Sequence, residues 1–504
     1  MFQSIGTIKN LREKKFFLEK INIYIKLINS YAENNNIAQQ KEKLGLETFE
    51  RLEELRIISK DHENDLVQLK KNLKPQLFND LIDAVNFNNS NREGLSDTLV
   101  KLDPVERKKN QSVIDLEKPT VIDFFCGAGG LSLGFSQAGY NIDLASDYED
   151  VCIETFKYNH PEIPDERIIL GDIRNIIDNL DNVITRDIDV VAGGPPCQGF
   201  SSANQQRVID DPRNELYKYY LKAIAKIAPK FVVMENVKGM LPYAEQIVED
   251  YENVNAYRGK ESFSYKVSYK LMVSSDFGVA QKRQRLIFIA IRSDIAENKN
   301  LTPAFILNQI QESSKTCKQH VLKDALNFIK PLESPRVKNM TEVDDDLTGK
   351  KIDVNQYEGN ENSYLKLINQ GKKINFIYNH KARYTNDINY EIYRTLDQGE
   401  DGTSKKIQHI MPYKHRNHIF KDKYFKLVEN KPSRTITAHL KMDCHSHIHP
   451  TQVRSITPRE AARIQSFPDD YMFLGAYLKT YMQIGNAVPP IMAKAIATEI
   501  KKHL

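Results

Sequence analysis

A cysteine that follows a proline-stiffened loop is the residue of this 504-residue chain whose type and position best suit covalent chemistry. The β-branched run at 188–192 is typical of a buried strand, and the sequence GGPPCQGFS at 193–201 follows it directly. Open α/β sheets carry their chemistry at the carboxyl ends of their strands, which is where this pattern places Cys197. A thiolate there could attack an electron-poor ring carbon. An inert cysteine in a structural turn is the alternative for this motif taken alone.

A carboxylate and two arginines are predicted near the same edge of a sheet. Glu235 ends the apolar run 231–234, and it could donate a proton to a substrate if burial raises its pKa. Its alternative role is to cap the following turn. Arg283 and Arg285 stand at alternate positions before the run 286–291, so we expect both to face one side. Guanidinium groups in that position could hold a carbonyl oxygen or a phosphate, unless they only form a basic surface edge.

A glycine-rich turn predicts a nucleoside cofactor. The sequence DFFCGAGGLS at 123–132 begins in the first strand-like run, and its glycines let the backbone approach a ligand closely. It lacks both the dinucleotide fingerprint and a phosphate-loop lysine, which favours a cofactor without a pyrophosphate. Asp147 follows the second run and could accept hydrogen bonds from ribose hydroxyls, and Asp172 follows the third and could accept one from an adenine amino group. Aspartates at such positions are also common turn and cap residues.

An α/β sheet must position these side chains. Strand-like runs alternate with helical patterns from Thr120 onward, which predicts a mostly parallel sheet with helices on both faces. The runs lie at 121–125, 142–146, 167–170, 189–192, 231–234 and 286–291. Between about 300 and 450 the alternation is lost, and irregular β structure with long loops is expected. A helix is then capped by Thr457, with Pro458 in its first turn and Glu460 in the position of a capping box.

The first 115 residues have a different pattern. Their apolar residues recur at helical spacing with lysine and glutamate between them, which predicts two or three long helices in a small bundle. A coiled-coil dimerisation arm is the alternative. The polar stretch 103–119 is typical of a linker. We therefore expect the helices to fold separately and to be dispensable for the chemical step.

The composition excludes several classes of protein. Hydrophobic residues make up 40% and charged residues 27% of the chain, as in soluble globular proteins, and it has no run of about 18 apolar residues. The N-terminus has no signal-peptide core and the five cysteines are scattered, so a cytoplasmic protein without a membrane partner is expected. A net charge of +4 permits a nucleic-acid partner without requiring one. The histidines after Cys444 are spaced too tightly for a tetrahedral site, so no metal is predicted.

Taken in order, these motifs resemble the DNA (cytosine-5)-methyltransferase family of bacterial restriction–modification systems. The order runs DFFCGAGG, PPCQGFS, ENV, QxRxR, REAARIQSFP and GNAVPP, and it covers about 120–300 and 430–504. The resemblance implies the Rossmann-like sheet of S-adenosylmethionine-dependent methyltransferases and a smaller, irregular β-rich target-recognition domain. The divisions implied are a helical extension at 1–117, a catalytic domain at 118–315 and 472–504, and a target-recognition domain at 316–471.

The resemblance also implies a mechanism. Cys197 would add to C6 of a cytosine flipped out of double-stranded DNA, and C5 would then take a methyl group from S-adenosylmethionine. Glu235 would bond the N3 side of the ring, and Arg285 would hold its O2 region with support from Arg283. The cofactor residues implied are Phe125, Gly127, Ala128, Gly129, Asp147, Tyr148, Asp172, Ile173, Pro196, Asn486, Ala487 and Val488. Asp147 stands where the family more often has glutamate.

Two other functions stay open at the level of the sequence. One is an RNA (tRNA) cytosine-5 methyltransferase built on the same fold, and the other is a non-catalytic DNA-binding homologue. The QGFS continuation and the long variable region favour DNA, and the joint presence of Cys197, Glu235 and Arg285 favours an active enzyme. Double-stranded DNA is the expected partner. A cognate restriction endonuclease acting on the same site and self-association through the N-terminal helices are further partners to test.

Overall fold

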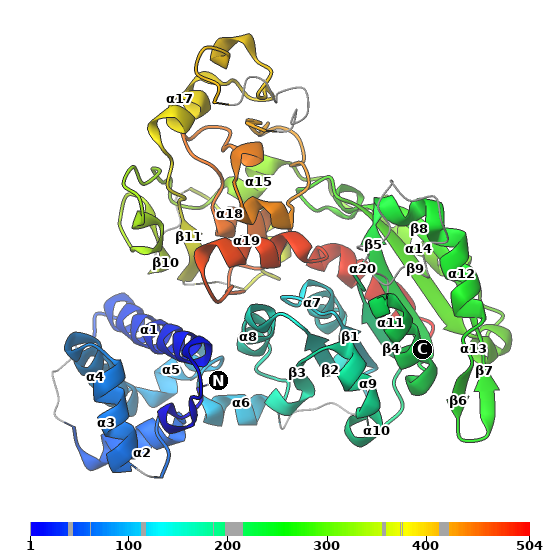
Figure 1. Ribbon diagram of the computed structural model, residues 1–504, viewed down its shortest axis with the longest axis horizontal. Coiled ribbons are helices and arrows are strands. Elements are labelled where there is room, and N and C mark those ends of the chain that lie inside the picture. Colours follow the sequence, from blue (N-terminus) through cyan, green and yellow to red (C-terminus); the bar gives the residue numbers. More distant parts are fainter. Residues whose placement is uncertain are drawn as a thin grey trace.

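The computed structural model describes residues 2–38, 44–60, 62–111, 117–184, 186–196, 215–354, 359–372, 374, 376–412 and 423–504. Cys197 lies outside these residues. Figure 1 shows a group of N-terminal helices beside a central sheet, with a second lobe (residues 316–471) above them. Within the described ranges, no helix is both long and apolar enough to cross a bilayer.

In the part of the chain that the structure describes, seven strands form the central sheet in the order β3-β2-β1-β4-β5-β9-β8. Their bounds are β1 Thr120–Phe124, β2 Asn141–Asp147, β3 Ile168–Leu170, β4 Val190–Gly193, β5 Phe231–Val237, β8 Tyr265–Val273 and β9 Gln284–Arg292. Strands β1 to β5 are parallel to one another, whereas β9 runs antiparallel to both β5 and β8. The prediction of a mostly parallel sheet is confirmed. The direction of β9 was not predicted, because a buried apolar run reads the same in either direction.

Helices cover both faces of this sheet, as predicted. One face packs against α9, α11 and α12, and the other against α7, α14 and α20. Their bounds are α7 Gly130–Gln137, α9 Ile173–Asp178, α11 Glu215–Ile227, α12 Ala244–Glu252, α14 Pro303–Ser314 and α20 Pro490–Lys501. The remaining elements of this part are α8 Asp150–Asn159, α10 Leu180–Val183, α13 Ser293–Asn298, α19 Tyr477–Asn486 and the small pair β6 Ala256–Arg258 and β7 Glu261–Phe263.

The register of the parallel strands brings their carboxyl ends to one edge. Phe124 of β1 pairs with Ser146 of β2 and with Gly193 of β4, and Gly193 pairs in turn with Met234 of β5. The turns that follow β1, β2, β4 and β5 therefore lie side by side. Every motif that the sequence analysis places after one of these strands is at this carboxyl edge.

The second lobe contains more helix than the sequence indicates. Its elements are α15 Leu322–Leu326, β10 Gly349–Val354, α16 Ser363–Ile368, β11 Phe376–Lys381, α17 Asp387–Thr395 and α18 Pro458–Ile464. Among the described residues, one antiparallel pair, β10 with β11, is its only sheet, so the expected β-rich structure is corrected to an irregular lobe with short helices. The reason lies partly in the asparagines, since Asn362 and Asn386 cap α16 and α17. The predicted capping box of Thr457 and Glu460 at the start of α18 is confirmed.

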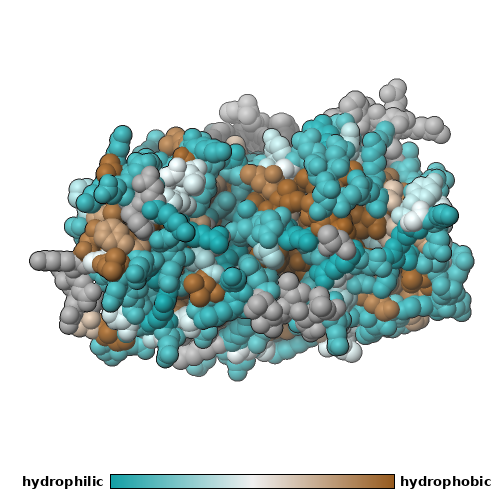
Figure 2. Space-filling model, turned by 90° about the horizontal axis from the view of Figure 1, so that it is seen from below, coloured by the Kyte–Doolittle hydropathy of each residue, from teal (hydrophilic) through white to brown (hydrophobic). Residues whose placement is uncertain are grey.

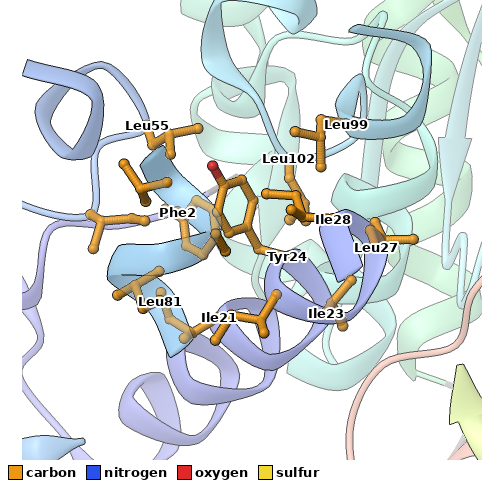
Figure 3. Close-up of a cluster of buried hydrophobic side chains, with 14 of the residues drawn as sticks. Phe2, Ile21, Ile23, Tyr24, Leu27, Ile28, Leu55, Leu81, Leu99 and Leu102 are labelled. Atoms are coloured by element: carbon orange, nitrogen blue, oxygen red, sulfur yellow. The ribbon is translucent and has the colours of Figure 1, made fainter. Parts of the chain in front are cut away.

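Within the described residues 2–111, six α-helices replace the two or three long ones that were expected. They are α1 Leu11–Asn34, α2 Leu46–Glu54, α3 His62–Asn72, α4 Pro75–Ser90, α5 Arg92–Leu99 and α6 Pro104–Gln111. Prolines begin two of them, since Pro75 and Pro104 are first residues of α4 and α6. Figure 3 shows Ile21, Tyr24 and Ile28 of α1 in one apolar cluster with Leu81, Leu99 and Leu102 of the same bundle. The apolar face of α1 is thus buried within the chain.

The stretch expected to be a linker contains a docked helix, α6. Arg107 of α6 is 1% exposed, and its guanidinium donates to the Lys157 carbonyl at 2.9 Å and to Asp165 Oδ1 at 3.0 Å. Both acceptors belong to the sheet part of the protein, so α6 is fixed to it. Hydrophilic residues cover most of the face seen in Figure 2, with brown hydrophobic patches between them.

Candidate active site

Glu235 and Arg285 form an ion pair at the carboxyl edge. Arg285 Nε lies 2.5 Å from Glu235 Oε1, and the two side chains are 13% and 12% exposed. The pair joins β5 to β9, where Val237 is the register partner of Arg285. Arg285 also donates from Nη1 to the carbonyl of Gln284 at 2.7 Å. The sheet thus presents a carboxylate and a guanidinium side by side at its carboxyl edge.

The loop that leads to Cys197 passes beside Glu235. A methyl group on Gly194 would lie 3.3 Å from Glu235 Oε2, so the backbone runs directly past the carboxylate. Asn236 on the same strand donates from Nδ2 to the Pro195 carbonyl at 3.1 Å. Strand β5 therefore holds both the loop and the carboxylate. The description ends at Pro196, one residue before Cys197.

Arg283 binds backbone carbonyls, whereas Arg285 pairs with Glu235. It is 1% exposed, and it donates to the carbonyls of Ile436 at 2.7 Å and Gly485 at 2.9 Å. Burial, with a smaller contribution from the neighbouring Arg285 charge, lowers its pKa to about 9. Arg283 therefore joins β9, the second lobe and the end of α19. Arg283 can support Arg285 only indirectly, by fixing the backbone that precedes it.

The glycine turn after β1 has the backbone shape that a closely approached ligand needs. Phe125, Gly127 and Gly129 all have positive φ, at 60°, 54° and 89°, and for a phenylalanine this is unusual. A methyl group on Gly127 would meet open space, whereas one on Gly129 would lie 2.6 Å from the Tyr471 hydroxyl. The open side of the turn is therefore at Gly127.

Asp147 connects the turns after β1 and β2. Its Oδ2 accepts from the Gly127 amide and its Oδ1 from the Glu149 amide, both at 2.8 Å. Burial raises the pKa of the Asp147 carboxyl, and these backbone hydrogen bonds oppose the rise. Each oxygen keeps a lone pair that could accept from a ligand hydroxyl.

Two exposed apolar side chains lie at the ends of β2 and β3. Tyr148 is 72% exposed and Leu170 is 52% exposed, and Asp172 follows shortly after Leu170. Asp172 caps α9 by accepting from the Arg174 amide at 2.9 Å, and it is paired with the Arg174 guanidinium at 2.7 Å. The hydrogen bond from the Arg174 side chain is the main cause of the lowered pKa of Asp172. The cap role weighed in the sequence analysis is present, and Ile173 is buried in the core. The sequence analysis did not single out Leu170, because the exposure of a side chain cannot be predicted from a strand-like run.

The C-terminal segment 486–488 closes the other side of the glycine turn. A methyl group on Gly130 would collide with the Val488 carbonyl and lie 3.0 Å from Ala487 Cβ, while Asn486 is exposed. Gln465 holds this segment, because its Nε2 donates to the carbonyls of Ile484 at 2.9 Å and Ala487 at 2.8 Å. The sequence analysis gave Gln465 no role, although its motif REAARIQSFP was recognised.

A basic groove begins at Arg285. It has a volume of about 480 Å³ and is lined by Val237, Lys238, Gly239, Lys282, Gln284, Arg285 and Thr435. A neighbouring groove of about 430 Å³ shares Lys282 and Thr435 and adds Lys431 and Arg434. The Arg434 guanidinium lies 4.6 Å from the centre of the Phe425 ring. Exposed lysines and an arginine along one groove suit a polyanion such as a nucleic-acid backbone.

No metal centre is found among the described residues, since no group of three histidine, cysteine or acidic side chains is arranged to hold an ion. The histidines after Cys444 have other partners. His445 stacks on Tyr424 with ring centres 4.5 Å apart, and its Nδ1 is 2.7 Å from the Tyr393 hydroxyl. These contacts are those of a packed interior.

Comparison with known proteins places this arrangement in one family. Residues 119–502 match the family described as C-5 cytosine-specific DNA methylase. The type II methyltransferase M.DdeI of Desulfomicrobium norvegicum is 32% identical over 405 residues, which are 75% of this chain and 88% of that protein. The type II methyltransferase M1.HphI of Haemophilus parahaemolyticus is 32% identical over 392 residues, or 76% and 87% of the two chains. The N-terminal helices lie outside the family match.

A solved structure shares the fold. It is that of a DNA modification methyltransferase encoded within a prophage of E. coli, with a TM-score of 0.55 and 24% identity. The likeness covers 76% of this chain and 99% of that one. The fold class implied by the sequence motifs is confirmed by this likeness.

Proposed function

Because this chain belongs to the C-5 cytosine-specific DNA methylase family, we propose that it methylates C5 of a flipped-out cytosine within a specific double-stranded DNA sequence. The chain is a DNA cytosine-5-methyltransferase of the type II restriction–modification kind. The observation that best supports the proposed chemistry is the Glu235–Arg285 pair beside the loop that leads to Cys197. A cytosine must leave the duplex to reach such a site.

The residues at the glycine turn fit S-adenosylmethionine. Open space beside Gly127, the carboxylate of Asp147 and the exposed ring of Tyr148 suit a nucleoside that lacks a pyrophosphate. The residues that would hold it are those predicted from the sequence: Phe125, Gly127, Ala128, Gly129, Asp147, Tyr148, Asp172, Ile173, Pro196, Asn486, Ala487 and Val488. When bound, it supplies an electrophilic methyl group.

The chain's own residues activate the cytosine ring. The Cys197 thiolate forms a bond to C6, and the electrons of the C5–C6 double bond move to C5, which becomes nucleophilic. Glu235 holds or supplies the proton at N3 that stabilises this adduct, and Arg285 faces the O2 side. Once C5 is methylated, a base removes the C5 proton, the double bond re-forms and the Cys197 thiolate leaves.

Sequencing of methylated cytosines tests the activity and its specificity together. DNA from cells that express the chain should carry 5-methylcytosine in one short sequence context. Purified protein should methylate duplex DNA in preference to tRNA, and the reverse preference would favour the RNA methyltransferase alternative. Absence of transfer to either substrate would favour the non-catalytic homologue.

Target recognition is proposed to lie in the second lobe, at 316–471. Its lysine, arginine, histidine, asparagine and tyrosine side chains are the groups that read base edges and bind phosphates. Exchange of residues 316–450 for those of a relative with another specificity should move the methylated site. An unchanged site would place recognition elsewhere. A cognate endonuclease, self-association and a cytoplasmic site of action at the nucleoid stay predictions.

A further inference from the structure

We propose that the N-terminal helices (residues 2–111) are a brace that sets the position of the second lobe over the carboxyl edge, and that Glu19 is its central positioning residue. This inference rests on the proposed function, because the effect assigned to the brace is on DNA binding. Among the described residues, Glu19, Lys20 and Lys26 of these helices pair with Gly475, Glu154 and Asp344, which belong neither to the Glu235–Arg285 pair nor to the glycine turn.

Glu19 stands at the junction of three parts of the chain. Its two carboxylate oxygens accept from the Gly475 amide at 3.0 and 2.9 Å, and its Oε1 also pairs with Lys351 Nζ. Lys351 in turn donates to the Gly475 carbonyl at 3.3 Å. Glu19 belongs to α1, Lys351 to β10 of the second lobe, and Gly475 to the segment just before α19. The three groups form a closed triangle of polar contacts.

The segment that ends at Gly475 is bound from both neighbouring parts as well. Asn159 of α8 exchanges two hydrogen bonds with the Met472 backbone, at 2.7 and 3.0 Å. Asn379 of β11 does the same with Phe473, at 2.9 and 3.0 Å. This segment is therefore the seam between the sheet part and the second lobe, and Glu19 holds its end.

Helix α1 also holds both parts through charge pairs. Toward the sheet part, Lys20 Nζ lies 2.6 Å from Glu154 on α8, and this lysine side chain is only 9% exposed. Toward the second lobe, Lys26 pairs with Asp344. One helix thus bridges α8 and the loop before β10. These pairs add to the direct contacts between the two parts, such as that of Arg283 with the Ile436 carbonyl.

Apolar packing makes this bridge stiff. The core of the N-terminal helices continues into Tyr158 of α8, Ile352 of β10, Tyr378 of β11, and Met472 and Leu474 of the seam. Residues of all three parts share one buried cluster, and close-packed interiors transmit displacement. The expectation that these helices fold separately is therefore replaced by a shared core.

A fixed distance between the lobes matters for a substrate that lies between them. The two neighbouring basic grooves are lined by Arg285 on the sheet and by Arg434 in the second lobe, so DNA bound along them would contact both parts. If the two lobes move relative to each other, DNA binding must also fix their relative position. The free-energy cost of this ordering lowers the affinity for DNA. A loosened brace should therefore raise the KM for DNA and leave the chemical step unchanged.

The test compares Glu19→Ala with Glu50→Ala, which removes the same charge from an exposed position on α2. We measure KM for DNA, single-turnover kcat at saturating DNA, the Kd for S-adenosylmethionine and hydrogen exchange of the Gly475 amide. For Glu19→Ala we expect KM to rise roughly tenfold, faster exchange at Gly475, and no change in the other two quantities. Glu19→Gln keeps an acceptor for the Gly475 amide and should restore much of its protection. Glu50→Ala should behave as the unaltered chain.

Two results would overturn the brace. One is an unchanged KM for DNA in Glu19→Ala. The other is a joint fall of kcat, cofactor affinity and thermal unfolding midpoint, which would make Glu19 a residue of general stability. If the unaltered chain methylates no DNA, the proposed function fails, and the hydrogen-exchange comparison still tests the brace by itself.

Discussion

Glu235 of β5 and Arg285 of β9 form an ion pair at the carboxyl edge of the sheet, with 2.5 Å between Glu235 Oε1 and Arg285 Nε. Each side chain is largely buried, so removal of one would leave the other charge without its partner in a poorly solvated place. The pair is placed by the register of β5 against β9. Its geometry is therefore a property of the sheet, and the base would meet groups already in position.

Replacing Glu235 with glutamine should slow methyl transfer by about 10²- to 10⁴-fold, the usual range for a positioned acid. Single-turnover transfer to duplex DNA measures this, and Glu249→Gln on the exposed side of α12 is the matched control. The Kd for S-adenosylmethionine should stay the same. Loss of cofactor binding together with the rate would assign Glu235 to the cofactor site or to the fold.

Cys197→Ser should abolish turnover, because a hydroxyl near neutral pH is a far poorer nucleophile than a thiolate. DNA with a 5-fluorocytosine target should trap the unaltered chain covalently, since release needs loss of a C5 proton. Gel electrophoresis of the adduct shows this directly. Cys317→Ser serves as the control. Normal methylation by Cys197→Ser would exclude the covalent mechanism.

Lys282→Ala should weaken DNA binding about equally for all sequences and reduce the slope of log K against log salt by about 1. The reason is that Lys282 is exposed and lines both basic grooves. Binding titrations at several salt concentrations measure the slope. Lys260→Ala, in the turn between β6 and β7, should leave it unchanged. An unaltered slope for Lys282→Ala would move the DNA backbone away from this groove.

Stability should fall as the pH rises toward neutrality because of Asp123. Burial, assisted by the nearby Asp147 charge, raises its pKa from 3.8 to about 7 against the hydrogen bond from Ser132. Below about pH 4 the Asp123 carboxyl is protonated in both the folded and the unfolded chain. Between about pH 4 and pH 7 the folded chain keeps this proton and the unfolded chain has released it. The free energy of unfolding therefore falls as the pH rises through this range.

Asp123→Asn should flatten that part of the stability profile. Thermal unfolding midpoints from pH 5 to 8 provide the comparison, with Asp178→Asn at an exposed position as the control. The slope is the quantity to compare, since the amide also changes the hydrogen bonding with Ser132. An equal slope in Asp123→Asn and the unaltered chain would mean that another group controls this pH range.

Local sequence patterns determined the elements and the family. Apolar runs located the parallel strands, because burial on both faces of a sheet leaves a continuous hydrophobic signal. The start of α18 was predicted to the residue, since Thr457, Pro458 and Glu460 satisfy the helix end by contacts within one turn. The ordered motifs determined the family for the same reason, as each occupies one short segment.

Tertiary structure alone decided which of these residues meet. Arg283 and Arg285 look equivalent in the sequence, yet one binds the backbone of Ile436 and the other pairs with Glu235. Glu19 carries no local signal for a partner 456 positions away, and only folding brings it to Gly475. Local spacing encodes the helices and strands, whereas contacts between distant segments depend on how the whole chain packs.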